Sequence, residues 1–114
     1  MKTLEFRIGN YIKYNDKIII VDTIYYDSIN MDLQDCDGIE INLLKPIPLT
    51  EEILLKCGFR KLDKYTFVIG GLFIHSRKLG FVFHLGKRKI ILSSLHQLQN
   101  LYFALTNEEL NIQL

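Results

Sequence analysis

Cysteine is scarce in this sequence, and long apolar runs are absent. Cys36 and Cys57 can form one disulfide at most, whereas small secreted domains that depend on disulfides usually carry about four or more cysteines. The cysteine count therefore favours a reducing, cytoplasmic compartment. The longest apolar stretches, 18–21 and 81–83, are far shorter than the roughly 20 residues that cross a bilayer. The N-terminus has no apolar segment typical of a signal peptide, so we expect neither secretion nor a membrane span.

The chain also lacks a surplus of glycine or proline and any internal repeat. Its 114 residues include 7 Gly and 2 Pro, which excludes fibrous and low-complexity classes. A hydrophobic content of 48% excludes a disordered chain. A chain of this length buries enough surface to form a core without a metal or a disulfide. We expect a single domain over 1–114, or its division into a β-rich lobe at 1–45 and a second lobe at 50–114.

A large excess of one charge is missing as well, but the near-neutral total hides two segments of opposite sign. The formal net charge is +1. Residues 1–55 carry ten acidic and five basic side chains, whereas residues 56–89 carry nine basic side chains and one acid, Asp63. Binding of a polyanion over the whole surface is therefore not expected. Local, salt-sensitive binding through the basic segment remains open.

The first 44 residues show short strands separated by turn signals. Asn15-Asp16 and Asp37-Gly38 are pairs typical of tight turns, and β-branched residues are concentrated between 17 and 26. This pattern predicts a small curved β-sheet or an SH3-like barrel. The two prolines within 45–49 then favour an extended connector, because proline restricts both itself and the residue before it.

The remainder of the chain predicts a helix, a sheet and a second helix. Thr50 is a suitable N-cap for a short helix that Gly58 ends. Alternating apolar residues over 64–92, with the turn pair Gly70-Gly71, favour a four-stranded antiparallel meander. Ser94 then begins a helix of about three turns that closes the meander. The predicted fold class is α+β.

Three stretches of the sequence resemble a known family. They are RIGNY at 7–11, PIPLTEE at 46–52 and HQLQNLYFALT at 96–106, of which the last is the most specific. The family consists of small proteins of unassigned function from gut-anaerobe bacterial genomes and their phages or prophages. The resemblance implies no activity. It implies a cytoplasmic or phage-encoded accessory protein.

The polar face of the predicted last helix suggests a first function. Phe103 lies there beside His96, Gln99 and Asn100, and a monomer has no reason to expose so large an apolar side chain among polar ones. We therefore predict a non-enzymatic protein-interaction or assembly module that binds a protein partner or a second copy through these four residues. In the alternative, the N-terminal lobe or the C-terminal tail covers Phe103.

The basic segment suggests a second function, a nucleic-acid-binding accessory protein. Its cations at the predicted turns of the meander would form one patch, with Tyr65 or Phe73 nearby to stack on bases. The turn residues concerned are Arg77, Lys78, Lys87, Arg88 and Lys89. Two alternatives stay open. In the first, these cations are solvated turn residues that only protect an edge strand against aggregation. In the second, they dock on the acidic lobe of the same chain.

The sequence contains no pattern typical of catalysis or metal binding. Its three histidines have no i, i+4 pairing, and no phosphate-binding glycine motif is present. Cys57 is placed at a helix C-terminus, where the dipole disfavours a thiolate. We therefore predict that the protein is not an enzyme and uses no cofactor or metal, and we see no sign of a small-molecule substrate.

Overall fold

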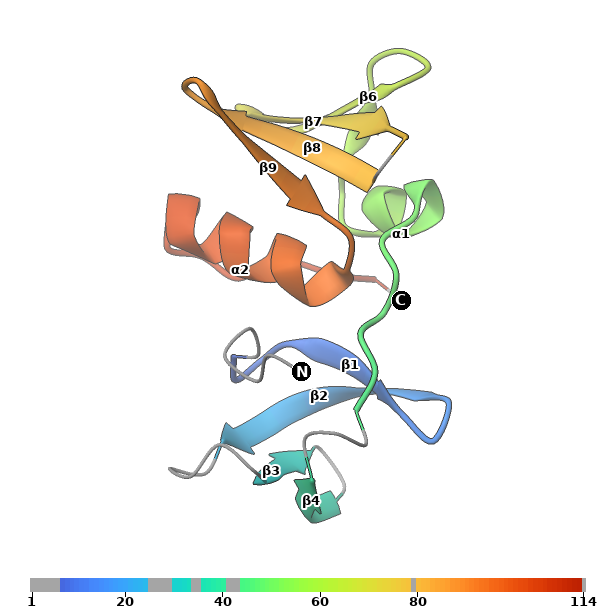
Figure 1. Cartoon of the computed structure of the whole chain (residues 1–114), viewed down its shortest axis with the longest axis vertical. Helices are drawn as coiled ribbons and strands as arrows, with labels where there is room; N and C mark the ends of the chain where they lie inside the picture. The colour runs from blue at the N-terminus through green and yellow to red at the C-terminus, as the bar shows by residue number, and fades with distance from the viewer. Residues whose placement is uncertain (1–6, 25–29, 34–35, 41–43, 79, 114) are drawn as a thin grey trace.

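The computed structural model describes residues 7–24, 30–33, 36–40, 44–78 and 80–113, and it shows an α+β fold. Two antiparallel sheets lie at opposite ends of the molecule, and two helices lie between them (Figure 1). The molecule measures 42 × 28 × 27 Å, so the sheets are separated along its longest axis. No helix in the described part of the chain is long and apolar enough to cross a membrane.

The N-terminal sheet is a four-stranded meander. Its strands are β1 (Tyr11–Tyr14), β2 (Lys17–Ile24), β3 (Asn30–Leu33) and β4 (Cys36–Glu40), paired in that order. Asn15 and Asp16 both have positive φ, as the predicted two-residue turn between β1 and β2 requires. The turn predicted at Asp37-Gly38 is wrong, because both residues belong to β4. The sheet form of the prediction is confirmed, whereas the SH3-like barrel stays a prediction.

The proline-containing connector at 44–49 is extended, as predicted, and it is bonded to both halves of the molecule. Lys45 forms an antiparallel bridge with Lys13 of β1. Pro48 bridges Ser94, and the backbone N–H of Leu49 donates to Ser93 at 3.0 Å. These contacts fix the path of the chain from one sheet to the other.

The helix α1 (Glu51–Lys56) begins and ends at the predicted caps. Thr50 Oγ1 accepts from the backbone N–H of Ile53 at 3.2 Å. Gly58 has φ +93°, and its N–H and that of Phe59 donate to the last carbonyls of the helix. This pair of bonds is the Schellman arrangement, which favours glycine at that position.

The second sheet contains five strands rather than the four predicted. They are β5 (Arg60–Lys61), β6 (Thr66–Ile69), β7 (Leu72–Arg77), β8 (Gly80–Leu85) and β9 (Arg88–Leu92), each paired with the next. The hairpin turn at Gly70-Gly71 lies where the sequence placed it, and a second hairpin turn lies at Gly86-Lys87. Gly80 has φ +137°, and a Cβ there would lie 3.1 Å from the carbonyl oxygen of Leu92.

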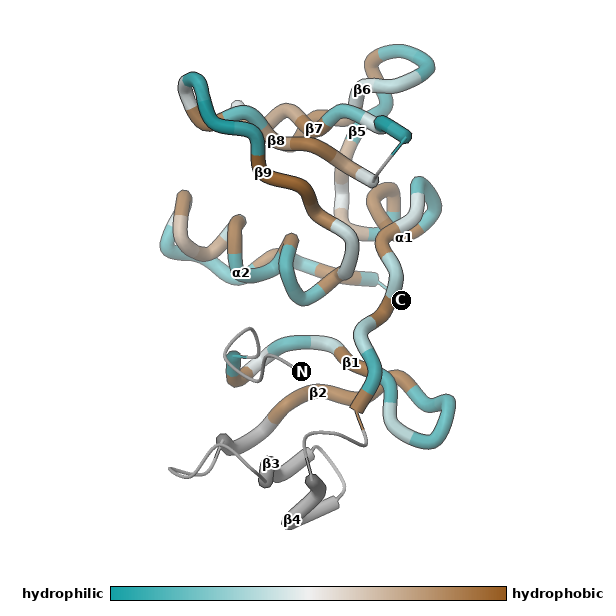
Figure 2. The backbone as a smooth tube through the Cα atoms, viewed as in Figure 1, coloured by the Kyte–Doolittle hydropathy of each residue, from teal (hydrophilic) through white to brown (hydrophobic). Residues whose placement is uncertain are grey.

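The helix α2 (Leu95–Thr106) packs its apolar face on the second sheet. Leu95 and Leu98 are fully buried against Phe67, Ile74 and other apolar residues of the sheet. Figure 2 shows hydrophobic residues along the facing parts of β8 and β9. Asn107 ends the helix with φ +61°. Residues 107–113, which follow it, form no regular secondary structure.

Candidate functional site

A turn immediately before β1 contacts the polar face of α2. Within this turn the backbone N–H of Asn10 donates to the carbonyl of Arg7 at 3.0 Å. Asn10 is fully buried, and its Oδ1 accepts from the Arg7 N–H at 2.6 Å. Gly9, with φ +96°, bonds through its N–H to the Val21 carbonyl of β2. The turn is therefore fixed both internally and to its own sheet.

Gln99 of α2 bonds to the backbone of this turn through both ends of its amide. The N–H of Tyr11 donates to Gln99 Oε1 at 2.8 Å, and Gln99 Nε2 donates to the carbonyl of Gly9 at 3.1 Å. The side chain is only 1% exposed. Gln99 therefore supplies a donor and an acceptor that the chain before β1 would otherwise lack.

Arg7 makes further contacts between the two halves. Its Nε donates to Asn100 Oδ1 at 3.0 Å, and its guanidinium forms an ion pair with Glu109 beyond the end of α2. Asn100 Oδ1 also accepts from Asn10 Nδ2 at 2.9 Å. The Arg7 guanidinium carbon lies 4.5 Å from the ring centroid of Phe103, within the range of a cation–π contact.

The four residues predicted to bind a partner thus face the interior to different degrees. His96 is 2% exposed, and its Nδ1 lies 3.2 Å from Ser94 Oγ. Gln99 and Asn100 bond to the N-terminal lobe, while Phe103 is half-buried under Arg7. These contacts match the alternative in which the N-terminal lobe covers this face. Partner binding here stays a prediction, and it would require these contacts to open.

The five basic turn residues do not form the single patch that we expected. Arg77 pairs with Gly80 at the first residue of β8, and Lys78 follows in the turn. Arg88 pairs with Leu85 at the last residue of β8, with the other two lysines beside it. A six-residue strand spans about 17 Å between these two ends. The meander therefore carries two basic clusters, one at each end of β8.

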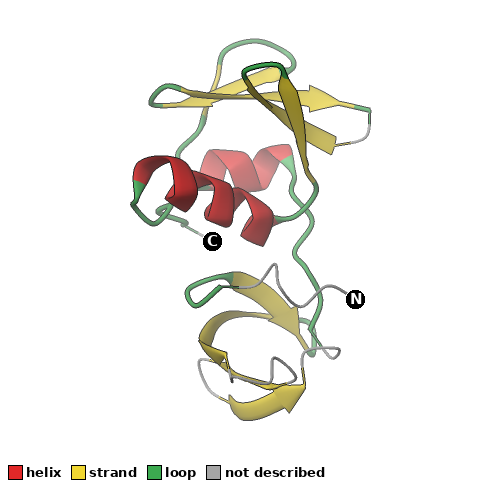
Figure 3. Ribbon diagram, turned by 60° about the vertical axis from the view of Figure 1, so that its left-hand side comes forward, coloured by secondary structure: helices red, strands yellow, loops and turns green. Residues whose placement is uncertain are grey.

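The face of the second sheet that points away from α1 and α2 joins these clusters. Directly paired residues of an antiparallel sheet project to the same face. Phe67, Ile74 and Phe81 project to the helices, so the alternate residues of the same strands project away from them. Figure 3 shows both helices on one side of the sheet. We call the opposite side the outer face.

Aromatic and basic side chains dominate the exposed part of the outer face. Phe73 is 46% exposed, and the rings of His75 and His84 lie 5.8 Å apart, centroid to centroid. Lys89 on β9 pairs with His84 on β8, and Lys89 is exposed. The complete set on this face consists of Arg60, Thr66, Val68, Phe73, His75, Arg77, Val82, His84, Lys89 and Ile91.

Few carboxylates balance these cations. Lys56 and Lys61 form ion pairs with the acids of α1, but no ion pair is recorded for the cations at either end of β8 within the described residues. Asp63 precedes β6 in the chain and lies near His75. The backbone N–H of Tyr65 and the hydroxyl of Thr66 lower the pKa of Asp63, so this carboxylate is charged at neutral pH.

An exposed tyrosine lies beside the basic cluster at the β7–β8 turn. Tyr65 is 52% exposed, and Lys64 Nζ lies 5.5 Å from its ring centroid. Tyr65 lines a shallow hollow of about 420 Å³ together with Ser76, Arg77 and Lys78. Tyr65 thus offers an aromatic ring next to cations at one end of the outer face. Phe73 offers a second ring on the face itself.

Cys57 is not suited to act as a nucleophile. The thiol is 1% exposed, and burial raises its pKa from 9.0 to about 11. It is therefore protonated at neutral pH, and a thiol reacts as its thiolate. The described residues also contain no group of three metal-ligating side chains.

Comparisons with known proteins add no function. No family model, curated protein or solved structure matches this chain. The resemblance to a family from gut anaerobes and their phages therefore stays a prediction. The stretches at 7–11 and 96–106 that carry it are the two that contact each other across the molecule.

Most residues of the outer face carry no local sequence signal. The histidine spacing indicates no metal site, and nothing next to Arg60 in the sequence marks it as part of a surface. The available signal lies in the two-residue alternation of the strands, which places Phe73, His75 and Arg77 on one face of β7. Aligning neighbouring strands on their hairpin turns would have added His84 and its neighbours.

Proposed function

We propose that this chain is a non-enzymatic module that binds single-stranded nucleic acid across the outer face of its second sheet. The observation that carries the proposal is the combination of exposed Phe73, the adjacent imidazoles and a basic cluster at each end of β8. On the outer face these side chains form a path of about 13 Å from Arg77, opposite Gly80, to Lys89, opposite His84.

The chemistry of this path suits a single strand better than a duplex. Proteins that bind single strands combine cations that follow the phosphates with aromatic rings on which bases stack. Bases in a duplex are already stacked on one another, so rings on an open sheet cannot reach their flat faces. Phe73 and Tyr65 offer such rings, and the clusters at the ends of β8 offer the cations.

A role without catalysis is supported by where the titratable groups lie. His84 and Lys89 are exposed on an open sheet rather than enclosed with a substrate, and Cys57 is buried as a thiol. We place the protein in the cytoplasm on its cysteine count, and in a phage or prophage context on its sequence resemblance. Both assignments belong to the proposal.

Binding of a fluorescent oligo-dT of about 15 nucleotides tests the proposal by anisotropy. We expect the logarithm of the affinity to fall linearly with the logarithm of salt concentration, by about 0.7 per phosphate contacted. Contacts at both clusters would give a slope of roughly −2 to −4. A duplex of the same length should bind more weakly at each salt concentration.

Two matched pairs of variants locate the surface. Phe73→Ala should weaken binding by about 5- to 150-fold, the range typical of one stacked base, whereas Ile18→Ala on β2 should not. Lys89→Gln should reduce the salt slope by about 0.7, whereas Lys45→Gln on the connector should leave it unchanged. Absence of binding at about 20 mM NaCl, or equal losses in both members of a pair, would refute the proposal.

A further inference from the structure

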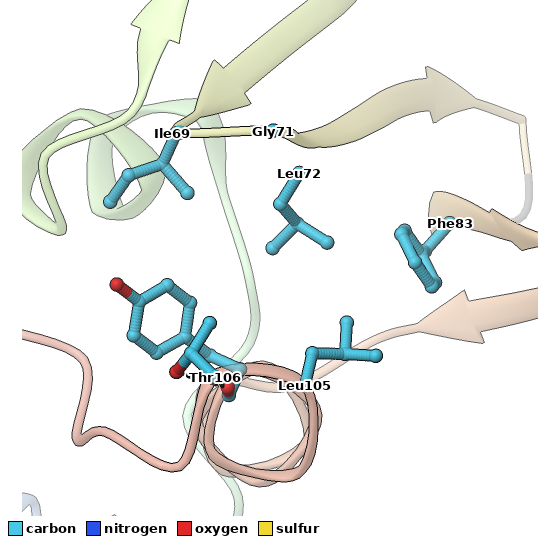
Figure 4. Close-up of a pocket in the computed structure, with 8 residues that line it drawn as sticks. Ile69, Gly71, Leu72, Phe83, Leu105 and Thr106 are labelled. Atoms are coloured by element: carbon cyan, nitrogen blue, oxygen red, sulfur yellow. Dashed lines mark hydrogen bonds between the residues drawn. The ribbon is translucent and has the colours of Figure 1, made fainter.

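A second surface of the molecule is a hollow between the second sheet and the end of α2. Its volume is about 310 Å³, and it opens between the β6–β7 turn and the last turn of α2 (Figure 4). It lies on the inner side of the sheet, opposite the outer face. Its walls are Ile69, Gly70, Gly71, Leu72, Phe83, Tyr102, Leu105 and Thr106.

The hollow exists because the packing of helix on sheet is tight at one end of α2 and loose at the other. Leu95 and Leu98, in the first half of the helix, are fully buried, but Leu105 in the last turn is 44% exposed. The residue-by-residue pairing of β7 with β8 also ends at His75–Val82, although both strands continue past that pair. Leu72 and Phe83 therefore border a space that no other described side chain fills.

The walls of the hollow define the chemistry that fits it. Six of the eight lining residues are apolar or glycine, and none is charged. Figure 4 shows Ile69 and Leu72 facing Leu105 and Thr106 across the space. The Thr106 hydroxyl already donates to the carbonyl of Tyr102. No hydrogen bond is recorded within the described residues for the phenol of Tyr102, which leaves one donor and acceptor at an apolar wall.

We propose that this hollow binds a small, uncharged, mainly apolar molecule of one or two rings that carries a single hydrogen-bonding group. A volume of about 310 Å³ lies at the lower end of the range for small-molecule sites, and such sites combine apolar walls with few polar groups. The ring contacts Leu72, Phe83 and Leu105, and its polar atom bonds to the Tyr102 hydroxyl. A charged ligand would leave its charge unpaired against these walls.

Phenol and toluene are suitable probes, because they differ by the hydrogen-bonding group alone. Titration of the isotope-labelled chain, followed by methyl NMR, should give saturable shifts at Ile69, Leu72 and Leu105. For ligands of this size we expect a dissociation constant on the order of 1 mM. Shifts spread over methyl groups of both sheets, or shifts that do not saturate, would overturn the proposal.

Three variants sharpen the experiment. Leu105→Glu should weaken both probes at least about 5-fold, whereas Leu55→Glu on α1, an equally exposed leucine elsewhere, should leave them unchanged. Tyr102→Phe should weaken phenol several-fold and leave toluene unchanged. Equal effects of the two leucine variants, or no effect of Tyr102→Phe on phenol, would contradict the assigned contacts.

The outcome separates this site from the nucleic-acid surface. Leu105→Glu should bind oligo-dT as the unmodified chain does, so failure of either proposal leaves the other measurable.

Short peptides with one leucine or phenylalanine serve as competitors. If they shift the same methyl groups and neither free probe does, the hollow is a protein-docking site and the small-molecule assignment is wrong.

Discussion

Replacement of Gln99 by leucine tests the contact between the two halves of the molecule most directly. Leucine has a similar size and is a good helix former, so α2 itself should be unaffected. The substitution removes both hydrogen bonds of the amide, which join α2 to the backbone of Tyr11 and Gly9. Those two backbone groups then lose their partner on α2.

The magnitude follows from the burial of these groups. An unsatisfied buried donor or acceptor costs about 1–3 kcal/mol. Tyr11 and Gly9 are half-buried, so water partly reaches them and the lower half of that range applies to each. We expect Gln99→Leu to reduce the free energy of unfolding by about 2–4 kcal/mol for the two groups together. This is a large part of the roughly 5–15 kcal/mol that stabilises a typical domain.

Urea unfolding, followed by far-ultraviolet circular dichroism, measures this loss. With a slope near 1.5 kcal/mol per molar urea, the midpoint should fall by roughly 1.3–2.7 M. Gln113→Leu near the C-terminus is the matched control, because that glutamine is exposed and its side chain bonds to Asn111 on the same exposed tail. Equal midpoints for the two variants would show that the Gln99 amide does not hold the halves together. Amide exchange at Tyr11 should accelerate in Gln99→Leu alone.

Two further predictions concern Arg7 and Cys57. Arg7→Ala should lower the free energy of unfolding in urea by about 1–2 kcal/mol, a modest loss because Arg7 and Glu109 are partly exposed. The loss should shrink near 1 M NaCl, because salt screens the ion pair. A loss that does not depend on salt would contradict an ionic contribution. Burial raises the pKa of Cys57 from 9.0 to about 11, so between these values the unfolded chain releases a proton that the folded chain keeps. The free energy of unfolding should therefore fall by at most about 2–3 kcal/mol as the pH rises from 9 to 11. This part of the loss should vanish in Cys57→Ala. Identical pH profiles for Cys57→Ala and the unmodified chain would refute the prediction.

The parts of the fold that sequence predicts correctly are those governed by neighbouring residues. Thr50 caps α1, Gly58 ends it and Gly70-Gly71 turns a hairpin, because each depends on bonds within a few residues. The strand β5 was missed for the opposite reason. Its two residues, Arg60 and Lys61, are both charged, and only pairing with β6 makes them a strand.

The candidate surfaces depend on pairings between distant residues, which local patterns do not reveal. Gln99 and Tyr11 are 88 positions apart, and nothing near Gln99 indicates that a backbone segment will bond to its amide. The sequence did identify the face of α2 that carries Phe103 as unusual, and it offered cover by the N-terminal lobe as one explanation. The prediction of one basic patch was wrong because the two basic turns lie at opposite ends of β8.

The position of the acidic segment decides whether the outer face is free to attract an anion. In sequence the acidic and basic segments nearly cancel, and docking of one on the other was an open alternative. In space the strands β2 to β4 lie at the opposite end of a molecule 42 Å long, with both helices between them and the second sheet (Figure 1). Charges interact weakly beyond about 8 Å at physiological salt. The acidic strands therefore neither cover nor neutralise the basic clusters of β8, and a phosphate backbone approaching the outer face meets those clusters with Asp63 as the nearby carboxylate.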